Sequence, residues 1–150
     1  MGHSLTKLLV HCVFSTKGRR ALLKGESSEK LNAYMAGIAR NHGAHLIRAG
    51  GTDDHRHLLL DLRPATSVAD IVRFIKANSS KWLHETYPET AGHGWQTGYA
   101  AFTVSESMRA SVIDYINNQE NHHRKMTFEE ELIAILDRHG IGYNRDAILE

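Results

Sequence analysis

The chain has 150 residues, a length that suits one domain with a real hydrophobic core, so we expect a single domain over residues 1–150. It carries 18 Lys and Arg against 17 Asp and Glu, a formal charge of +1, so any nucleic-acid binding must come from local clusters of charge and not from a bulk positive field. A single cysteine, Cys12, excludes an intramolecular disulfide, and the lack of a long apolar stretch or an apolar secretory signal excludes a membrane span, so we expect a cytoplasmic protein with no membrane partner.

The first part of the chain predicts a strand, a helix and a β-hairpin. Residues 8–15 form an apolar, β-branched run that is typical of a strand and ends at the basic turn 17–20. Segments 44–49 and 55–62 flank the turn-rich residues 50–54, as in a hairpin. Between them a helix is expected, with Ser27 or Ser28 as its N-cap, Gly43 as its stop, and apolar residues at helical spacing, namely Leu31, Tyr34, Met35 and Ile38.

The second part predicts a helix, a strand and two further helices. Ser67 and Asp70 have the spacing of a capping box at the start of a helix that ends before Pro88, and a glycine-containing loop leads to a strand over residues 99–104. A third helix starts at Ser105 or Ser107, reaches about His123, and turns Met108, Val112, Ile113 and Ile116 to the core. Thr127 and Glu130 form a capping box for a fourth helix that stops at Gly140.

This order of elements is that of a ferredoxin-like α+β fold, an antiparallel four-stranded sheet, with C-terminal helices added. In such a fold two helices cover one sheet face and leave the other available. Strand alternation points Leu58, Leu60 and Leu62 to the covered face, whereas His55, His57 and Asp61 point to the other face with Leu59. The predicted fold therefore places two histidines on an open surface.

His55 and His57 can share one divalent ion, because imidazoles two residues apart on a strand lie on the same face. Such a site needs further ligands, and the spacing also fits a plain surface pair. Tyr115, Gln119 and His122 fall on one flank of the third helix. A tyrosine there is commonly a packed ring with a wet hydroxyl, but a phenol near a cation can also act as a covalent nucleophile, and the Gln119 carboxamide oxygen could complete a metal shell.

The chain resembles the single-tyrosine HUH transposases of the smallest bacterial insertion sequences, and also the REP-associated tyrosine transposases. The resemblance runs over nearly the whole chain, with separated motifs in the same order and spacing. They are residues 11–17 (HCVFSTK), Asp54 with residues 55–60 (HRHLLL), residues 95–99 (WQTGY), residues 115–123 (YINNQENHH) and residues 127–131 (TFEEE).

The resemblance implies a metal-dependent DNA strand transferase that cuts single-stranded DNA at the ends of an insertion sequence and rejoins it. Carried over to this sequence, His55, His57 and Gln119 would hold Mg²⁺ or Mn²⁺, and Tyr115 would attack the scissile phosphate to give a 5′-phosphotyrosine. The family further implies a homodimer that recognises DNA hairpins, with the tyrosine helix of one subunit able to complete the histidine site of the other. Arg56 departs from the family, which usually has a hydrophobic residue between the histidines; either its stem packs and its guanidinium reaches the sheet edge, or the local strand pairing is shifted.

Other polar residues receive secondary roles. Asp54 and His122 are candidates for supporting the site. Trp95 is expected as a loop anchor more than as a stacking platform for bases, and Tyr143 ranks below Tyr115 as nucleophile because it lacks a glutamine at helical spacing. His11 is expected to face solvent or a DNA phosphate, with a position beside the metal as the alternative. Candidate DNA contacts are His11, Lys17, Arg19, Arg20, Arg73, Lys76, Lys81 and His123, although a solvated helix face explains Arg73, Lys76 and Lys81 about as well.

Two other function classes fit part of the sequence. A non-catalytic single-stranded nucleic-acid-binding module would use the sheet and the basic clusters but has no need for the histidine pair, the tyrosine and the glutamine. A small zinc hydrolase would use His55 and His57 with a third ligand and activated water, and would be indifferent to Tyr115.

Overall fold

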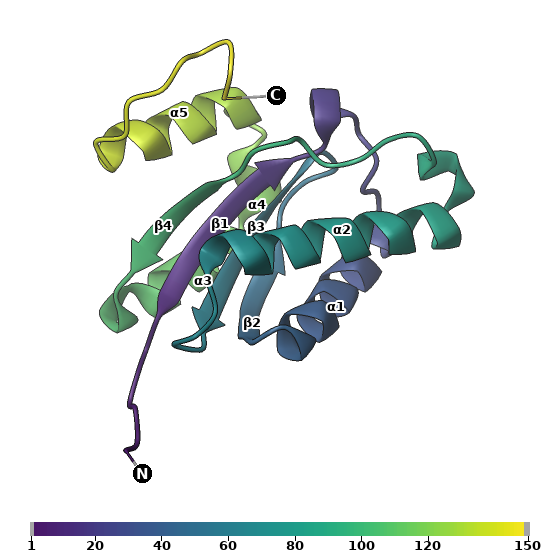
Figure 1. Ribbon diagram of the computed structural model, residues 1–150. Coiled ribbons are helices and arrows are strands. Elements are labelled where there is room, and N and C mark those ends of the chain that lie inside the picture. Colours follow the sequence, from purple (N-terminus) through teal and green to yellow (C-terminus); the bar gives the residue numbers. More distant parts are fainter. Residues whose placement is uncertain (1, 149–150) are drawn as a thin grey trace.

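The computed structural model describes residues 2–148, in which a four-stranded antiparallel sheet lies between two groups of helices (Figure 1). Among these residues, no helix combines the length and the apolar character needed to cross a membrane. The elements are β1 (Leu9–Ser15), η1 (Lys17–Arg19), α1 (Glu26–Asn41), β2 (Ala44–Gly50), β3 (His55–Leu62), α2 (Val68–Thr86), η2 (Pro88–Thr90), β4 (Ala100–Val104), η3 (Glu106–Met108), α3 (Arg109–Asn117), α4 (Gln119–His122) and α5 (Phe128–Arg138).

The strand order is β2-β3-β1-β4, and each neighbouring pair is antiparallel. This order confirms the ferredoxin-like arrangement. The two middle strands, β1 and β3, pair residue by residue from Leu9 opposite Asp61 to Ser15 opposite His55. The histidine pair thus lies on an inner strand that is hydrogen-bonded on both sides, which gives its side chains a rigid base.

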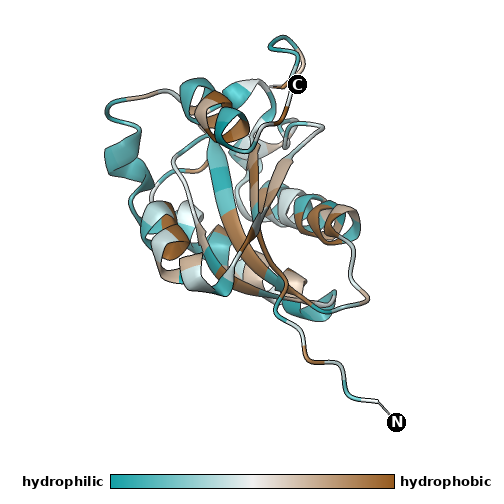
Figure 2. Ribbon diagram, turned by 90° about the vertical axis from the view of Figure 1, so that its left-hand side faces the viewer, coloured by the Kyte–Doolittle hydropathy of each residue, from teal (hydrophilic) through white to brown (hydrophobic). Residues whose placement is uncertain are grey.

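One sheet face packs against α1 and α2, which lie in front of the sheet in Figure 1. Leu58 and Leu60, both 0% exposed, join Phe14, Ile71 and Ile75 in the main core, as the strand alternation predicted. Figure 2 shows the hydrophobic strand segments in the middle of the molecule, with helices on either side. The face opposite α1 and α2 is therefore the one that carries His55 and His57.

The expectation that this second face is available is wrong, because the C-terminal helices cover it. Ile116 of α3 packs on Leu9 and Leu59. On the neighbouring part of the sheet, α5 packs on Val13 and Phe102 through Phe128, Leu132, Ile135 and Leu136. His55 and His57 are consequently 0% exposed, and the site they form is an enclosed one.

Two predicted helix ends also differ. The N-cap of α1 is Gly25 with φ +56°, a left-handed conformation, and neither Ser27 nor Ser28 caps the helix. The third predicted helix is interrupted at Asn118, whose N–H bonds back to the carbonyls of Asp114 and Tyr115 and closes α3 before α4 begins. Met108, expected in the core, is 51% exposed. The capping predictions for α2 and α5 are confirmed, since Ser67 accepts from the Asp70 N–H and Thr127 forms a full capping box with Glu130.

Candidate active site

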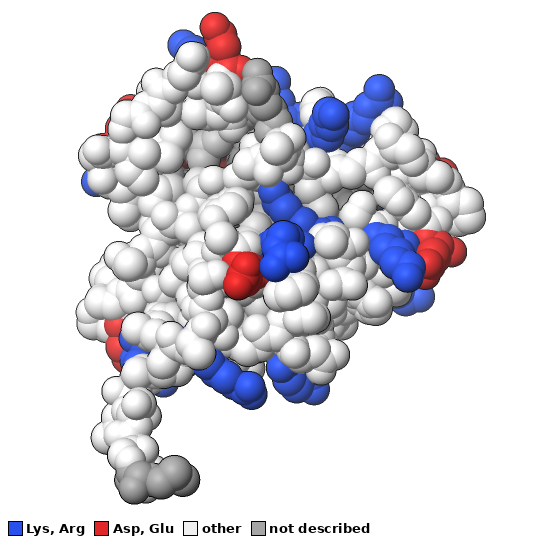
Figure 3. Space-filling view, in the orientation of Figure 1, with Lys and Arg blue, Asp and Glu red and all other residues white. Residues whose placement is uncertain are grey.

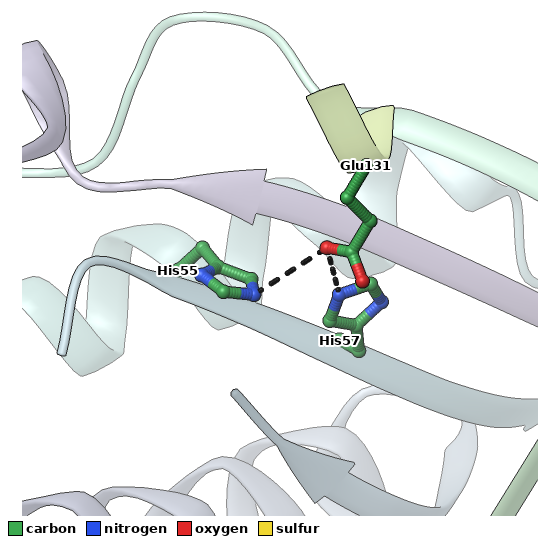
Figure 4. A group of neighbouring side chains, drawn as sticks. All are labelled: His55, His57 and Glu131. Atoms are coloured by element: carbon green, nitrogen blue, oxygen red, sulfur yellow. Dashed lines mark hydrogen bonds and ion pairs between the residues drawn. The ribbon is translucent and has the colours of Figure 1, made fainter. Parts of the chain in front are cut away.

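His55 and His57 of β3 meet a carboxylate that the sequence reasoning missed, that of Glu131 on α5 (Figure 4). Glu131 Oε1 lies 3.0 Å from Nε2 of His57 and 3.6 Å from Nε2 of His55. One potential ligand atom from each of the three residues lies within 4.8 Å of the others, and all three side chains are buried. Two imidazole nitrogens and a carboxylate oxygen form a donor set suited to a divalent metal ion.

The other ring nitrogen of each histidine is held by a second residue. His55 Nδ1 lies 2.8 Å from Asp54 Oδ1, and His57 Nδ1 lies 2.8 Å from His11 Nε2 across the β1–β3 pair. Outer contacts of this kind fix the orientation of a metal-binding imidazole and leave its Nε2 lone pair directed at the ion. This arrangement supports the proposed supporting role of Asp54. His11 is buried, so the expected position facing solvent or DNA is wrong, and the alternative position beside the group that could hold a metal ion is the one observed.

Gln119 and His123 complete the inner group. Gln119 Oε1 lies 2.8 Å from His55 Nε2, while its Nε2 donates to Glu131 Oε2 at 2.9 Å. His123 Nε2 lies 3.1 Å from both Gln119 Oε1 and Glu131 Oε1. His123 was expected as a DNA contact, but in the structure it bonds within the site.

Tyr115 lies on the same group from α3. Its hydroxyl donates to Glu131 Oε2, and its ring centroid is 5.6 Å from that of His57. His122 also contacts the Tyr115 ring edge-on, with centroids 5.0 Å apart. All four residues assigned to the catalytic and metal roles, His55, His57, Tyr115 and Gln119, are therefore together in one chain, although the helix between Tyr115 and Gln119 is interrupted.

The electrostatics keep the centre anionic at Glu131 and disfavour the charged forms of His57 and His11. Burial alone would raise the pKa of Glu131, but hydrogen bonds with His123, His57 and Tyr115 outweigh it and leave that pKa well below its ordinary value. Burial lowers the pKa of His57, and it lowers the pKa of His11 to about 3. Burial and the bond to Glu131 raise the pKa of the Tyr115 phenol, so the hydroxyl is held in its protonated form here.

A signal for Glu131 was present in the sequence. On α5 it falls on the same side as Phe128, Leu132 and Ile135, so a carboxylate interrupts an otherwise apolar helix face. An acidic residue in a core position needs a partner. Its partners come from β3, α3 and α4, which are distant in sequence, and helical spacing cannot identify them.

Arg56 is fully buried beneath the site, on the side that faces α1. Its guanidinium donates to the carbonyls of Thr52 and His55 at 2.9 Å each, and to the hydroxyl of Ser28. The strand pairing is not shifted at this position, because Arg56 lies opposite Phe14 in the continuous β1–β3 register. Burial lowers the pKa of Arg56 to about 10. Arg56 thus ties the loop carrying Asp54 to the start of α1.

The basic residues proposed to contact DNA are not gathered at the site. Arg73 pairs with Asp70, and Lys76 donates to the carbonyls of Gln96 and Gly98 at 2.8 and 2.6 Å. Both residues and exposed Lys81 lie on α2, on the opposite side of the sheet from Tyr115. On the face drawn in Figure 3, Lys and Arg side chains occur in separate small groups and form no continuous patch.

The remaining candidates from the sequence are the basic turn at residues 17–20, Trp95 and Tyr143. Lys17, Arg19 and Arg20 are exposed, and Arg19 pairs with Glu129 of α5 at 3.6 Å. Trp95 is a loop anchor, as expected: it packs edge-on against Phe14 and donates to Ser79 Oγ at 2.9 Å. Tyr143 is 38% exposed in the segment after α5.

A cleft of about 1300 Å³ opens beside the group of His55, His57 and Glu131. Asp54, His123 and Phe128 line the cleft, and Arg19, Lys24, Arg124 and Lys125 contribute positive charge. Acidic residues line it as well, among them Glu26, Glu29, Asp53, Glu120 and Glu130. The cleft gives solvent and ligands an approach to the site, but its charge is mixed.

Comparison with known proteins gives consistent results over most of the chain. Residues 4–119 match the family described as transposase IS200-like. The ISDra2 transposase TnpA of Deinococcus radiodurans is 31% identical over 120 residues, 77% of this chain and 86% of that protein. The transposase for insertion sequence element IS200 of Salmonella typhimurium is 27% identical over 124 residues, 79% of this chain and 81% of that protein.

Two solved structures share the fold. A crystal structure described as a candidate transposase from Deinococcus radiodurans superposes with a TM-score of 0.65 at 30% identity, covering 79% of this chain and 96% of that one. A REP-associated tyrosine transposase bound to a REP hairpin gives a TM-score of 0.61 at 14% identity, covering 82% of this chain and 72% of that one, and at that identity the likeness concerns the fold alone.

Proposed function

Because the chain belongs to the IS200-like transposase family, we propose that it cleaves and rejoins single-stranded DNA at the ends of an insertion sequence through a covalent 5′-phosphotyrosine at Tyr115. The observation that carries this proposal is the meeting of Tyr115 with the buried group of His55, His57 and Glu131. A module that only binds nucleic acid has no need to bury two histidines and a carboxylate together and to place a phenol against them.

The residues present fit a divalent metal ion. His55 and His57 have their Nδ1 atoms engaged by Asp54 and His11, which leaves Nε2 of each for an ion. We propose that these two nitrogens, Gln119 Oε1 and Glu131 Oε1 hold Mg²⁺ or Mn²⁺; the oxygens suit either ion, and the imidazoles favour Mn²⁺. When bound, such an ion would polarise the scissile phosphate and stabilise the negative charge on the oxygen that leaves.

Tyr115 supplies the nucleophile. The Tyr115 oxygen forms a bond to phosphorus while the bond from phosphorus to the 3′ oxygen of the upstream nucleotide breaks. Glu131 Oε2, which already accepts the Tyr115 hydrogen bond, is placed to pass the phenolic proton on to solvent, and the released 3′ oxygen takes up a proton from solvent and ends as a hydroxyl. The phosphodiester energy stays in the phosphotyrosine, so attack by another 3′-hydroxyl rejoins the DNA without ATP.

We further propose that the DNA substrate carries a hairpin at the element end and that two copies of the chain act together. Membership of the IS200-like transposase family supports the first part, together with the fold shared with a transposase bound to a REP hairpin. Within the described residues, α3 of this chain lies on its own sheet, with Ile116 packed on Leu59. In this arrangement each subunit of the dimer would form its own active site.

The test is to trap a denaturant-resistant complex between the protein and labelled single-stranded DNA in the presence of Mg²⁺ or Mn²⁺. The wild-type chain is expected to form the complex, and Tyr115→Phe should bind the same DNA without forming it. An adduct that survives the substitution would overturn the assignment of Tyr115. No cleavage with either metal would favour the nucleic-acid-binding module, and turnover that is indifferent to Tyr115 would favour a zinc hydrolase.

A further inference from the structure

A groove of about 590 Å³ lies between β4, α3 and α5 and ends at Tyr115. Its volume is within the roughly 300–1,000 Å³ of sites that enclose small organic molecules. The residues that decide its chemistry are His11, Met108, Val112, Tyr115, Arg138 and His139. None of the roles assigned above uses this groove, although the proposed nucleophile lines it.

Apolar side chains and a cation line the groove. The apolar ones include Phe102, Val112 and Ile135, and Met108, which also lines the groove, is 51% exposed. A flat base can pack on such a surface, and the thioether of Met108 is well suited to contact an aromatic ring. The cation is Arg138, which forms no ion pair with any residue between 2 and 148.

The charge of this groove differs from that of the cleft beside Asp54. No Asp or Glu of the described chain lines the groove, whereas acidic residues line the cleft together with the basic ones. A phosphate attached to a base would therefore meet the cation Arg138 and hydroxyl groups such as those of Ser105 and Ser111 without a nearby carboxylate on the groove wall. The apolar lining of the groove therefore suits a base, and its cation and hydroxyl groups suit a phosphate.

The chemistry of the attack decides which nucleotide this is. In an in-line displacement the attacking and leaving oxygens lie on opposite sides of phosphorus, so the upstream nucleotide that leaves with the 3′ oxygen departs away from Tyr115. The downstream nucleotide is joined to phosphorus through its 5′ oxygen and stays on the enzyme. It is the one that can lie beside the Tyr115 helix.

We propose that the groove between β4, α3 and α5 is the binding site for the nucleotide immediately 3′ of the cleaved phosphate, with its base against Met108 and Val112 and its phosphate side toward Arg138. This inference rests on the proposed strand transfer by Tyr115. It assigns Met108 and Arg138 to substrate binding and explains why Met108 is exposed at the start of α3.

The probe is the single-stranded DNA that flanks the gene encoding this chain, with the cleavage position read from the trapped adduct. An abasic residue is then placed immediately 3′ or immediately 5′ of the cleaved phosphate. Binding is measured by fluorescence anisotropy with Tyr115→Phe, which cannot cleave, alone and combined with Met108→Ala or Arg138→Gln. Arg40→Gln, an exposed position on α1, is the matched charge control.

Loss of the 3′ base should weaken binding about tenfold, as expected for one stacked base, and Met108→Ala should then add little further loss. Loss of the 5′ base and Met108→Ala should weaken binding independently of each other. Arg138→Gln should weaken binding, whereas Arg40→Gln should not.

The assignment of the groove would be overturned if the effect of Met108→Ala depended on the 5′ base, or on neither base. In that case the trapped adduct would still support the proposed function. A wild-type chain that neither binds nor forms an adduct would overturn both. If either substitution dissociates a dimer and leaves DNA binding unchanged, the groove is a contact between copies.

Discussion

Tyr115 donates its hydroxyl hydrogen to Glu131, and the other oxygen of the same carboxylate lies 3.0 Å from Nε2 of His57. One side chain of α5 therefore joins the proposed nucleophile on α3 to the histidine pair on β3. Because Glu131 is 1% exposed and its pKa is held low by its partners, the carboxylate is a fixed negative charge at the centre of the site. A negative charge there favours the binding of a cation.

Glu131→Gln should weaken the binding of Mn²⁺ about 10–100-fold, the range found when groups that support metal sites are altered. The amide preserves the shape of the side chain but removes the charge, so the comparison isolates the carboxylate. Isothermal titration calorimetry of the metal-free protein measures the affinity. Asp137→Asn, on an exposed position of the same helix, is the control and should bind Mn²⁺ as the wild type does. Equal affinity in both variants would exclude Glu131 from the metal site.

The difference between Glu131 and the histidine pair shows what the sequence could predict. His55 and His57 belong to one strand, and alternation alone places them on the face opposite Leu58 and Leu60, which the structure confirms. Glu131 reaches them only because α5 folds back over the sheet, and no local periodicity encodes that return. For the same reason, the sequence predicted that the sheet face carrying His55 and His57 would be uncovered.

His11 and Asn118 illustrate two further limits. The bond between His11 and His57 follows from the pairing register of β1 and β3, which neither strand specifies alone. The break at Asn118 was missed because Tyr115 and Gln119 have the spacing of a continuous helix, and a single asparagine is a weak signal for interruption. The capping boxes, by contrast, are local patterns, and the helix starts they predicted at Ser67 and Thr127 are correct.

A mixture of two inactive chains should stay inactive if each site forms within one subunit. Tyr115→Phe lacks the proposed nucleophile, and His57→Ala lacks a proposed metal ligand. In the structure Tyr115 lies on the His57 of its own chain, with ring centroids 5.6 Å apart. The measurement is the formation of covalent DNA adduct after the two variants are mixed and allowed to exchange subunits. Recovery of adduct in the mixture would instead show that the tyrosine helices are exchanged between subunits.

The stability of the metal-free protein should fall as the pH is lowered from 7.0 to 5.5, in part because of His11. Burial, followed by the proximity of His57, lowers the pKa of His11 from 6.5 to about 3. In this interval the unfolded chain takes up a proton at His11 and the folded chain does not, so acid favours unfolding, by about 1 kcal/mol for this residue. Urea unfolding at the two pH values measures the loss. His11→Gln, which can still accept a hydrogen bond from His57, should lose about 1 kcal/mol less than the wild type over the same interval, and an identical loss would assign the effect to other groups.

Arg56→Met should destabilise the fold by about 2–4 kcal/mol, because three hydrogen bonds from a charged donor are lost while the carbonyls of Thr52 and His55 stay in place. Methionine retains much of the buried stem, so packing loss contributes little. Since the freed loop carries Asp54, which orients His55, affinity for Mn²⁺ should fall in the same variant. Urea unfolding and calorimetry measure the two effects, with Arg63→Met at an exposed position as the control. If the variant were as stable as this control, the hydrogen bonds of the buried guanidinium would only balance the cost of its dehydration, as happens for some buried charges. The loop would then be held by its backbone hydrogen bonds, such as that from the Thr16 N–H to the Asp54 carbonyl.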